Sequence, residues 1–171
     1  EAFNKRHFTE FERHSRVGMV TEEALINRVK ELRNLGAKYV FLKTGAYRPS
    51  DVARAVKYSS EAGIDLLTVD GAGGGTGMSP WRMMNEWGIP SVEIWSMTHM
   101  YAEKLAKRGD YIPSIALAGG ITMEDHIFKA LALGAPYVKA VGMARAPLTA
   151  AMVAKNVGKR ITEGNMPVYY G

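Results

Sequence analysis

Glycine marks the end of each of four apolar runs in this 171-residue sequence. The runs "KYVFLKTG", "IDLLTVDG", "PSIALAGG" and "YVKAVG" end at Gly45, Gly71, Gly119–Gly120 and Gly142. Backbone without side chains lets a ligand approach closely, and its N–H groups can bind an anion. The repeated pattern therefore predicts a binding site to which several strand ends contribute.

The densest glycine cluster lies in "VDGAGGGTGMSP", residues 69–80. Gly71 and Gly73 supply the first part of a dinucleotide-binding G-x-G-x-x-G, and Glu93 lies where a ribose-binding acid is expected. However, Thr76 stands in place of the third glycine, and Met-Ser-Pro interrupts the helix that this motif requires. A Walker A loop fits less well still, because no Gly-Lys-Ser/Thr follows the glycines. A flexible surface loop and a loop lying against a flat ring remain as interpretations.

Charged side chains accompany these glycines. Lys43 ends the run "FLKTG", where it either extends into solvent or points into the site as a cation that stabilises developing negative charge. In "LAGGIT" two glycine N–H groups lead into a helix start, which favours an anion. "VGMARA" repeats this arrangement and adds Arg145, whose guanidinium binds phosphate through two hydrogen bonds. Two glycine-rich strand ends of this kind, which we call strand exits, predict a ligand that carries a phosphate.

Other residues with possible chemistry have plainer explanations. His7 and His14 would share a helix face but have no third ligand nearby, so no metal site is expected. Capping or core contacts explain His99 and His126, which lie in expected helices. Side chains that could cover a flat ligand, but that more often belong to cores or interfaces, are Trp81, Met83, Met84 and Trp87.

Helical periodicity between the apolar runs supplies the elements that must position these residues. Thr21 is a candidate N-cap, Gly36 and Gly63 are candidate helix ends, and Thr122 with Asp125 fits a capping box. The run "KYVFLKTG" is apolar throughout, which suits a strand buried on both faces. Helices are expected over residues 21–36, 48–63, 80–109, 121–135 and 144–160.

Strands that alternate with helices pair in parallel. In a doubly wound sheet one glycine-rich turn binds the phosphate, whereas several strand ends share the site of a (β/α)8 barrel. Glycine at all four exits favours the barrel, but a closed barrel needs about 250 residues. We therefore expect an α/β fold, half of a TIM-type barrel with about four parallel βα units. The chain is expected to be one domain, with an N-terminal extension over 1–20, βα units over 21–160 and an irregular tail over 161–171.

Composition limits the classes of function. The net charge is +5, from 22 basic and 17 acidic residues, and the basic residues are interleaved with acids on the expected helices. No nucleic-acid partner is therefore predicted. The absence of cysteine excludes disulfides and cysteine-bound clusters within this chain and fits the cytoplasm. No apolar stretch reaches about 18 residues, so no membrane span is expected.

"VDGAGGGTGMSP" followed by "WGIP", and then "IALAGGITMEDHIFKALALGAPYVKAVGMA", resembles the FMN-binding domain of the glutamate synthase family. The family's glycine segment reads much like Asp-Gly-x-x-Gly-Gly-Thr-Gly-x-x-Pro. The later segments are shared more widely among FMN-dependent α/β-barrel oxidoreductases. The match runs from about residue 38 to residue 160. It implies that the four units are strands five to eight of an FMN barrel, its C-terminal half, and that "IPSVEIW" begins a helix.

The resemblance also implies roles for single residues. Lys43 corresponds to the lysine that faces the pyrimidine side of the flavin, where its charge favours the reduced ring. Lys43 and Asp70 are the candidate catalytic residues. The candidate FMN-binding residues are Lys43, Gly71, Gly73, Gly74, Gly75, Thr76 and Gly77 near the ring and substrate, and Gly119, Gly120, Gly142, Met143 and Arg145 near the phosphate.

The implied activity is a flavin-mediated hydride transfer to a small 2-oxo or imino acid such as 2-iminoglutarate. Synthases of this family carry a 3Fe–4S cluster bound by cysteines, an amidotransferase domain and an N-terminal barrel half, and this chain has none of them. We therefore expect another chain or a second copy to complete the barrel. Two alternatives stay open: a flavin-free barrel lyase or isomerase that binds a phosphate ester, and a non-catalytic half-barrel subunit.

Overall fold

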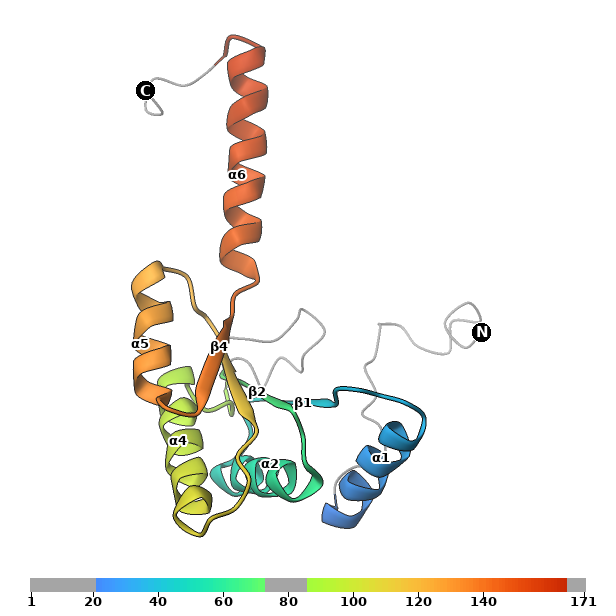
Figure 1. The fold of residues 1–171 in the computed structure, drawn as a ribbon. Coiled ribbons are helices and arrows are strands. Elements are labelled where there is room, and N and C mark those ends of the chain that lie inside the picture. Colours follow the sequence, from blue (N-terminus) through green and yellow to red (C-terminus); the bar gives the residue numbers. More distant parts are fainter. Residues whose placement is uncertain (1–20, 73–85, 166–171) are drawn as a thin grey trace, which may run out of the picture.

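The computed structural model describes residues 21–72 and 86–165, which form a four-stranded parallel sheet with the strand order β1-β2-β3-β4 (Figure 1). The strands are Phe41–Thr44 (β1), Leu66–Asp70 (β2), Ser114–Ala118 (β3) and Val138–Gly142 (β4). The helices are Glu22–Asn34 (α1), Pro49–Ala62 (α2), Ser91–Lys107 (α4), Glu124–Gly134 (α5) and Arg145–Thr162 (α6).

Local signals in the sequence set the ends of the first helices. The hydroxyl of Thr21 accepts a hydrogen bond from the backbone N–H of Ala24 at 3.2 Å, as expected of an N-cap. Pro49 opens α2 with a φ already suited to a helix, and Gly63 ends it in the left-handed region at φ +66°. Helix α4 begins at Ser91, which confirms that "IPSVEIW" is not a strand.

The predicted capping box of α5 is wrong. The helix begins at Glu124, its N-cap is Met123, and no side chain caps it. Thr122 contacts His126 instead: the Thr122 backbone N–H donates to Nδ1 of His126 at 3.3 Å, and the Thr122 hydroxyl lies 3.3 Å from the same nitrogen. In a capping box the Asp125 carboxylate would accept the Thr122 backbone N–H. Here the imidazole of His126 accepts it instead.

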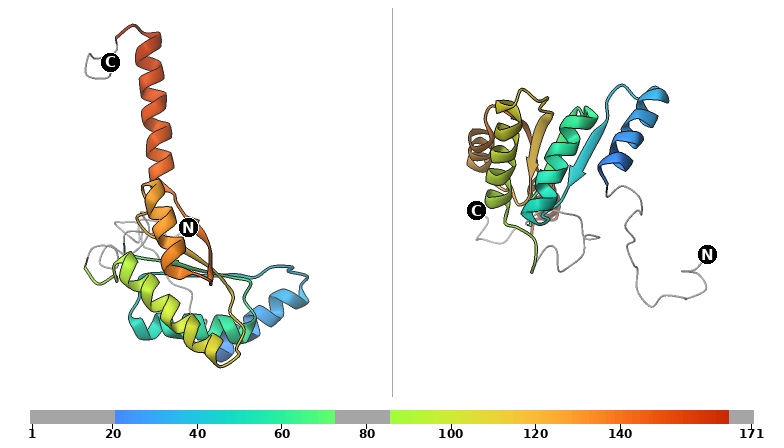
Figure 2. Two further views of the ribbon diagram at one scale, coloured as in Figure 1. Left: turned by 60° about the vertical axis from the view of Figure 1, so that its left-hand side comes forward. Right: turned by 90° about the horizontal axis from the view of Figure 1, so that it is seen from below.

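One face of the sheet is covered and the other is open. Leu67, Val69, Ile115 and Leu117 are fully buried in a core shared with α2, α4 and α5. Figure 2 shows these helices side by side along the sheet, and α1 packs next to α2. A doubly wound sheet carries helices on both faces, whereas consecutive strands with helices on one face are the arrangement of a barrel. The structure is therefore a partial (β/α)8 barrel.

The prediction that the first strand is buried on both faces is wrong. β1 is an edge strand, and the side chains of Phe41 and Lys43 alternate with the half-buried Leu42 and Thr44. Phe41 is 62% exposed. In register with Phe41 and Lys43, residues Leu66 and Thr68 lie on the same open face. The apolar run reflects a second face that the described residues leave uncovered.

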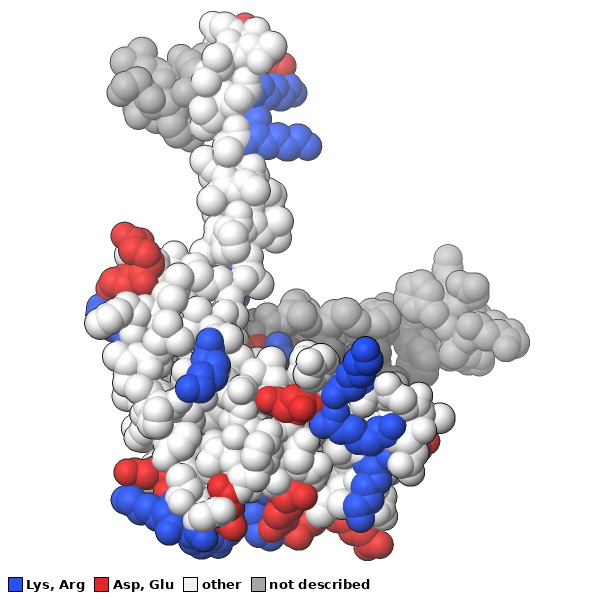
Figure 3. Space-filling model, in the orientation of Figure 1, with Lys and Arg blue, Asp and Glu red and all other residues white. Residues whose placement is uncertain are grey.

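Helix α6 differs from the other helices because none of its 18 residues is buried. It continues from β4 and projects away from the sheet (Figure 1, Figure 2). On the face that Figure 3 shows, the surface of α6 is largely uncharged near the sheet, and Lys and Arg side chains lie toward its far end. The helix runs to Thr162, two residues into the segment predicted to be irregular. None of the described helices combines the length and hydrophobicity that spanning a bilayer requires.

Candidate active site at the carboxyl edge of the sheet

The predicted site residues gather where the parallel strands end, which we call the carboxyl edge. Asp70 pairs in register with Ala118, and Ala118 pairs with Gly142. The three residues therefore form one row across β2, β3 and β4, and the glycine exits Gly71 and Gly119 follow directly. The structure thus brings together strand ends that are far apart in the sequence.

Lys43 and Asp70 form an ion pair at this edge. Nζ of Lys43 lies 2.8 Å from Oδ2 of Asp70; the lysine side chain is 59% exposed, whereas the aspartate side chain is only 8% exposed. A buried carboxylate is costly unless a charge or hydrogen bond compensates it. Asp70 therefore holds the ammonium group near the open face of the sheet, so the cation is fixed although its stem is exposed.

The side chains beside Lys43 on the open face are small. Lys43 pairs in register with Thr68, Thr68 with Ala116, and Ala116 with Ala140. Side chains of paired residues in parallel strands point to the same face. This row therefore carries no large side chain and has one cation at its end, which suits a flat ring, although Ala116 itself is only 7% exposed.

The absence of side chains at Gly71 and Gly119 has a cause inside the chain. A Cβ on Gly71 would overlap Oγ and Cα of Ser91, and a Cβ on Gly119 would lie 2.5 Å from Oγ of Ser91 and 2.7 Å from the Gly71 nitrogen. Gly119 also has φ +119°, which disfavours any other residue. The close approach predicted from the glycines is thus made, at these two positions, by α4.

Helices α5 and α6 follow the glycine exits of β3 and β4, and only one of these two has a first turn that suits an anion. The first turn of α5 carries Glu124 and Asp125, and Oδ2 of Asp125 bonds Nζ of Lys129 at 2.6 Å. That bond lowers the pKa of Asp125 and keeps its negative charge in place. The first turn of α6 has no acidic residue and begins with Arg145. Since a helix N-terminus is positive, an anion is favoured at α6 and opposed at α5.

The backbone around the last two exits leaves little room for side chains. Gly120 has φ +75°, in the left-handed region. A Cβ on Gly142 would lie 3.0 Å from Cβ of Ala118, tighter than ordinary contact. Met143 and Arg145 follow Gly142 directly, at the start of α6. Of the two exits in the predicted phosphate cradle, the β4 exit leads into the helix start that favours an anion, whereas the β3 exit leads into the acidic first turn of α5, contrary to the expectation from "LAGGIT".

The remaining candidate residues are the histidines and the glycine loop with the residues after it, and most of them lie outside the described part of the chain. Among the residues that are described, no group of three or more His, Asp or Glu could hold a metal ion. His99 lies midway along α4 with its ring centroid 5.6 Å from that of Tyr137, a packing contact. The residues outside the description are Gly73, Gly74, Gly75, Thr76 and Gly77 of the glycine loop, Trp81, Met83 and Met84 after it, and His7 and His14.

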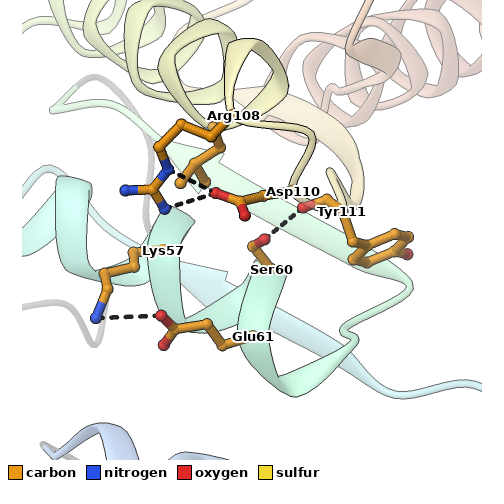
Figure 4. Close-up of a pocket in the computed structure, with 7 residues that line it drawn as sticks. Lys57, Ser60, Glu61, Arg108, Asp110 and Tyr111 are labelled. Atoms are coloured by element: carbon orange, nitrogen blue, oxygen red, sulfur yellow. Dashed lines mark hydrogen bonds and ion pairs between the residues drawn. The ribbon is translucent and has the colours of Figure 1, made fainter.

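A cavity of about 170 Å³ lies at the opposite end of the sheet, beside the C-terminal ends of α2 and α4 (Figure 4). Its charged residues neutralise one another: Nζ of Lys57 lies 3.2 Å from Glu61, and Arg108 bonds Asp110 at 2.5–2.8 Å. The Ser60 hydroxyl donates to the carbonyl of Tyr111. Because its polar groups have partners within the chain, this cavity is a poor candidate site.

Sequence reasoning missed Ser91 and Trp95 as residues of the site region. The Ser91 hydroxyl donates to the Gly119 carbonyl at 2.6 Å, and the Trp95 Nε1–H donates to the Ala118 carbonyl at 3.1 Å. Both lie more than 20 residues before their partners, so no local motif marks them. The sequence signal for such a residue is the pair Gly71 and Gly119 itself. Glycines at the ends of neighbouring strands indicate that another residue lies in the space their side chains would occupy.

Comparison with known proteins points to one family. The family model described as "Conserved region in glutamate synthase" matches residues 13–157. The glutamate synthase large subunit-like protein YerD of Bacillus subtilis is 28% identical over 116 residues, which are 67% of this chain and 22% of that protein. An archaeal-type glutamate synthase [NADPH] of Thermotoga maritima is 35% identical over 89 residues, 52% of this chain and 17% of that protein. The chain thus spans about a fifth of the length of these relatives.

A solved structure gives a weaker match. The crystal structure of 2,3-dimethylmalate lyase, a PEP mutase/isocitrate lyase superfamily member, aligns with 88% of this chain and 68% of its own chain. The sequence identity is 10% and the TM-score is 0.41, so nothing further is drawn from this likeness.

Proposed function

Because the chain belongs to the glutamate synthase family, we propose that it forms the FMN-binding portion of a glutamate synthase-like oxidoreductase. The observation that carries this proposal is the carboxyl edge. There, a fixed cation lies beside a row of small side chains, and two glycine exits with Arg145 follow at its other end. A flat, anionic ligand with a phosphate group fits this combination.

In this proposal, one part of the carboxyl edge binds the ring of FMN and another part binds its phosphate. The open face beside Lys43 and Thr68 would hold the ring, because Ala116 and Ala140 leave its surface free of large side chains. The exits at Gly119, Gly120 and Gly142, with Met143 and Arg145, would hold the phosphate through backbone N–H groups and a guanidinium. Gly73, Gly74, Gly75, Thr76 and Gly77 would complete the ring side.

FMN, when bound, would supply hydride transfer to a 2-oxo or imino acid such as 2-iminoglutarate. The chain's own residues would bind and orient the reactants. The Lys43 ammonium, held by Asp70 at 2.8 Å, would place positive charge where negative charge develops on reduction. Because Asp70 is buried and Lys43 is not, the aspartate would fix the lysine without meeting the ligand itself.

We propose that a second half-barrel completes this site, either in another chain or in a second copy. Three surfaces support it: the edge of β1, the edge of β4, and α6 with no buried residue. Unpaired strand edges favour pairing with a further strand. We place the assembly in the cytoplasm, with no nucleic-acid or membrane partner, because the chain has no cysteine and its charges are mixed.

Purification of the chain, followed by its visible absorption spectrum and identification of any molecule released on denaturation, tests the proposal. We expect FMN, retained or taken up when added, at about one per completed barrel, with the number of chains taken from the solution mass. A colourless protein that also fails to bind added FMN would overturn the proposal.

Replacing the fixed cation tests the role of Lys43 in the same material. Lys43→Met should lower the reduction potential of bound FMN, because the reduced ring loses a positive neighbour. Lys30→Met is a matched control, since Lys30 is an exposed lysine on α1 and its loss changes the net charge equally. An equal potential in both variants would count against the assignment.

A further inference from the structure

Ser91, the first residue of α4, lies between the ends of two strands at the carboxyl edge. Its hydroxyl donates to the Gly119 carbonyl at 2.6 Å. Side chains at Gly71 and Gly119 would both collide with Ser91 Oγ. The serine thus fills the space between the β2 exit and the β3 exit and is bonded to one of them.

A second set of hydrogen bonds joins the same two exits at one carbonyl group. The oxygen of Ala118 accepts the Gly71 N–H at 2.9 Å and the Trp95 Nε1–H at 3.1 Å. Trp95 is 6% exposed and lies one helical turn after Ser91. Ser91 and Trp95 of α4 therefore bond the carbonyls of Ala118, the last residue of β3, and of Gly119, which follows it.

The segment that leads into α4 extends these links to the first strand. The N–H of Ile89 donates to the Ala46 carbonyl at 3.2 Å, and the Ile89 carbonyl accepts from the Ala72 N–H at 2.9 Å. Residues 89–95 thus contact the ends of β1, β2 and β3. A connected, partly buried network of this kind restricts its members to a single arrangement.

We propose that Ser91 is a positioning residue that fixes the β2 exit relative to the β3 exit. Asp70, which holds Lys43, directly precedes Gly71, and Gly119 directly precedes Gly120. Ser91 thereby couples the ring side of the FMN site to its phosphate side, an inference that rests on the proposed function. Loss of its hydroxyl should loosen the exits without removing any group that touches the ligand.

Hydrogen exchange in the full chain tests the coupling without any ligand. In Ser91→Ala, the Gly71 amide proton and the Trp95 indole proton should exchange about fivefold faster or more, because the partner of both, Ala118, is less firmly held. The Leu67 amide in the middle of β2 should not change. Ser96→Ala is the matched control, because Ser96 is an exposed serine on the same helix and should leave all three protons unchanged.

FMN binding measured by fluorescence quenching supplies the second readout. Ser91→Ala should weaken binding about tenfold, which corresponds to the loss of about 1.4 kcal/mol. Trp95→Phe keeps the ring in the core but removes the indole donor, and it should shift both readouts in the same direction by a smaller factor. Ser96→Ala should bind FMN like the unaltered chain.

The two readouts separate this inference from the proposed function. If the unaltered chain binds no FMN, the proposed function fails, and faster exchange at Gly71 with Leu67 unchanged still supports the positioning role. Unchanged exchange at Gly71 and Trp95 in Ser91→Ala, together with unchanged exchange at Gly71 in Trp95→Phe, would overturn it, whatever the affinity. Equal acceleration at Gly71 and Leu67 would also overturn it, since Ser91 would then only stabilise the whole domain.

Discussion

The centre of the sheet and its two edges are built in different ways. Strands β2 and β3 are buried against α2 and α4, and their exits are joined by hydrogen bonds to Ala118 and Gly119. Strands β1 and β4 expose Phe41 and Ala140 on the open face, and α6 after β4 has no buried residue. The chain thus completes its own core at the centre but not at either edge.

This difference matters because the candidate site spans both regions. Asp70 and Gly119 belong to the fixed centre, whereas Lys43 lies on one edge strand and Arg145 follows the other. The centre therefore supplies the frame of the site, and the edges supply its positive charges.

A matched pair of isoleucines gives the largest expected contrast. Ile94 on α4 is 0% exposed and Ile161 on α6 is 63% exposed. Ile94→Ala should lower the free energy of unfolding by about 2–5 kcal/mol, because it leaves a cavity in the core. Ile161→Ala should change it by less than about 0.5 kcal/mol in the isolated chain. Urea unfolding measures both, and comparable losses would show that α6 is packed against the body.

Gly71→Ala tests how tightly the central exits are built. The added Cβ would overlap the Cα of Ser91, which is backbone and cannot turn away, so we expect a loss of about 2–3 kcal/mol. Gly158→Ala on α6 is the control, since a Cβ there meets nothing within 4 Å. An unchanged melting temperature for Gly71→Ala would mean that α4 can move away from the β2 exit.

Asp65 ties the edge strand to the centre and gives a prediction about pH. Its carboxylate accepts from the Val40 N–H at 2.6 Å and from Arg33 Nη2 at 2.6 Å. The Val40 N–H, followed by Arg33, lowers the pKa of Asp65 below its ordinary value. Because the pKa of Asp65 is lower in the folded chain than in the unfolded chain, its carboxylate stabilises the fold at any pH above the unfolded-state pKa of about 4. This contribution is lost as the pH falls through the folded-state pKa.

Asp65→Asn should therefore cost about 1 kcal/mol at pH 7 and progressively less below pH 4. Urea unfolding of the variant and of the unaltered chain between pH 7 and pH 3 measures the difference. A difference that stays constant across this range would contradict the assignment of the lowered pKa to the folded state.

The smallest expected effect is a gain. Gly158 lies inside α6 at an ordinary helical φ with open space around it. Gly158→Ala should stabilise the helix by about 0.5–1 kcal/mol, because alanine loses less backbone entropy. Circular dichroism during thermal unfolding measures the change, and a destabilised variant would show that a backbone lies against this position.

The sequence predicted those features that are determined by neighbouring residues. Thr21, Pro49 and Gly63 act within one helical turn, and each was placed correctly. The parallel βα order followed from the alternation of strands and helices. The glycine exits were found because each ends an apolar run, and parallel strands bring such ends to one edge.

Features that depend on contacts distant in the sequence could not be predicted in the same way. The exposure of Phe41 depends on what covers the open face, and its apolar run cannot show whether the cover belongs to this chain. A local contact also differs from the prediction, since Thr122 contacts His126, four residues later, instead of capping the helix. Ser91 acts through Gly119, 28 residues away, so only the folded structure reveals it.

Comparing FMN with riboflavin tests the central claim most directly, because riboflavin has the ring but not the phosphate. If the exits at Gly119, Gly120 and Gly142 with Arg145 bind the phosphate, the purified chain should bind FMN at least about tenfold more tightly than riboflavin, a difference of about 1.4 kcal/mol. Fluorescence titration at one ionic strength measures both dissociation constants. Equal affinity for the two flavins, or binding of neither, would contradict the account.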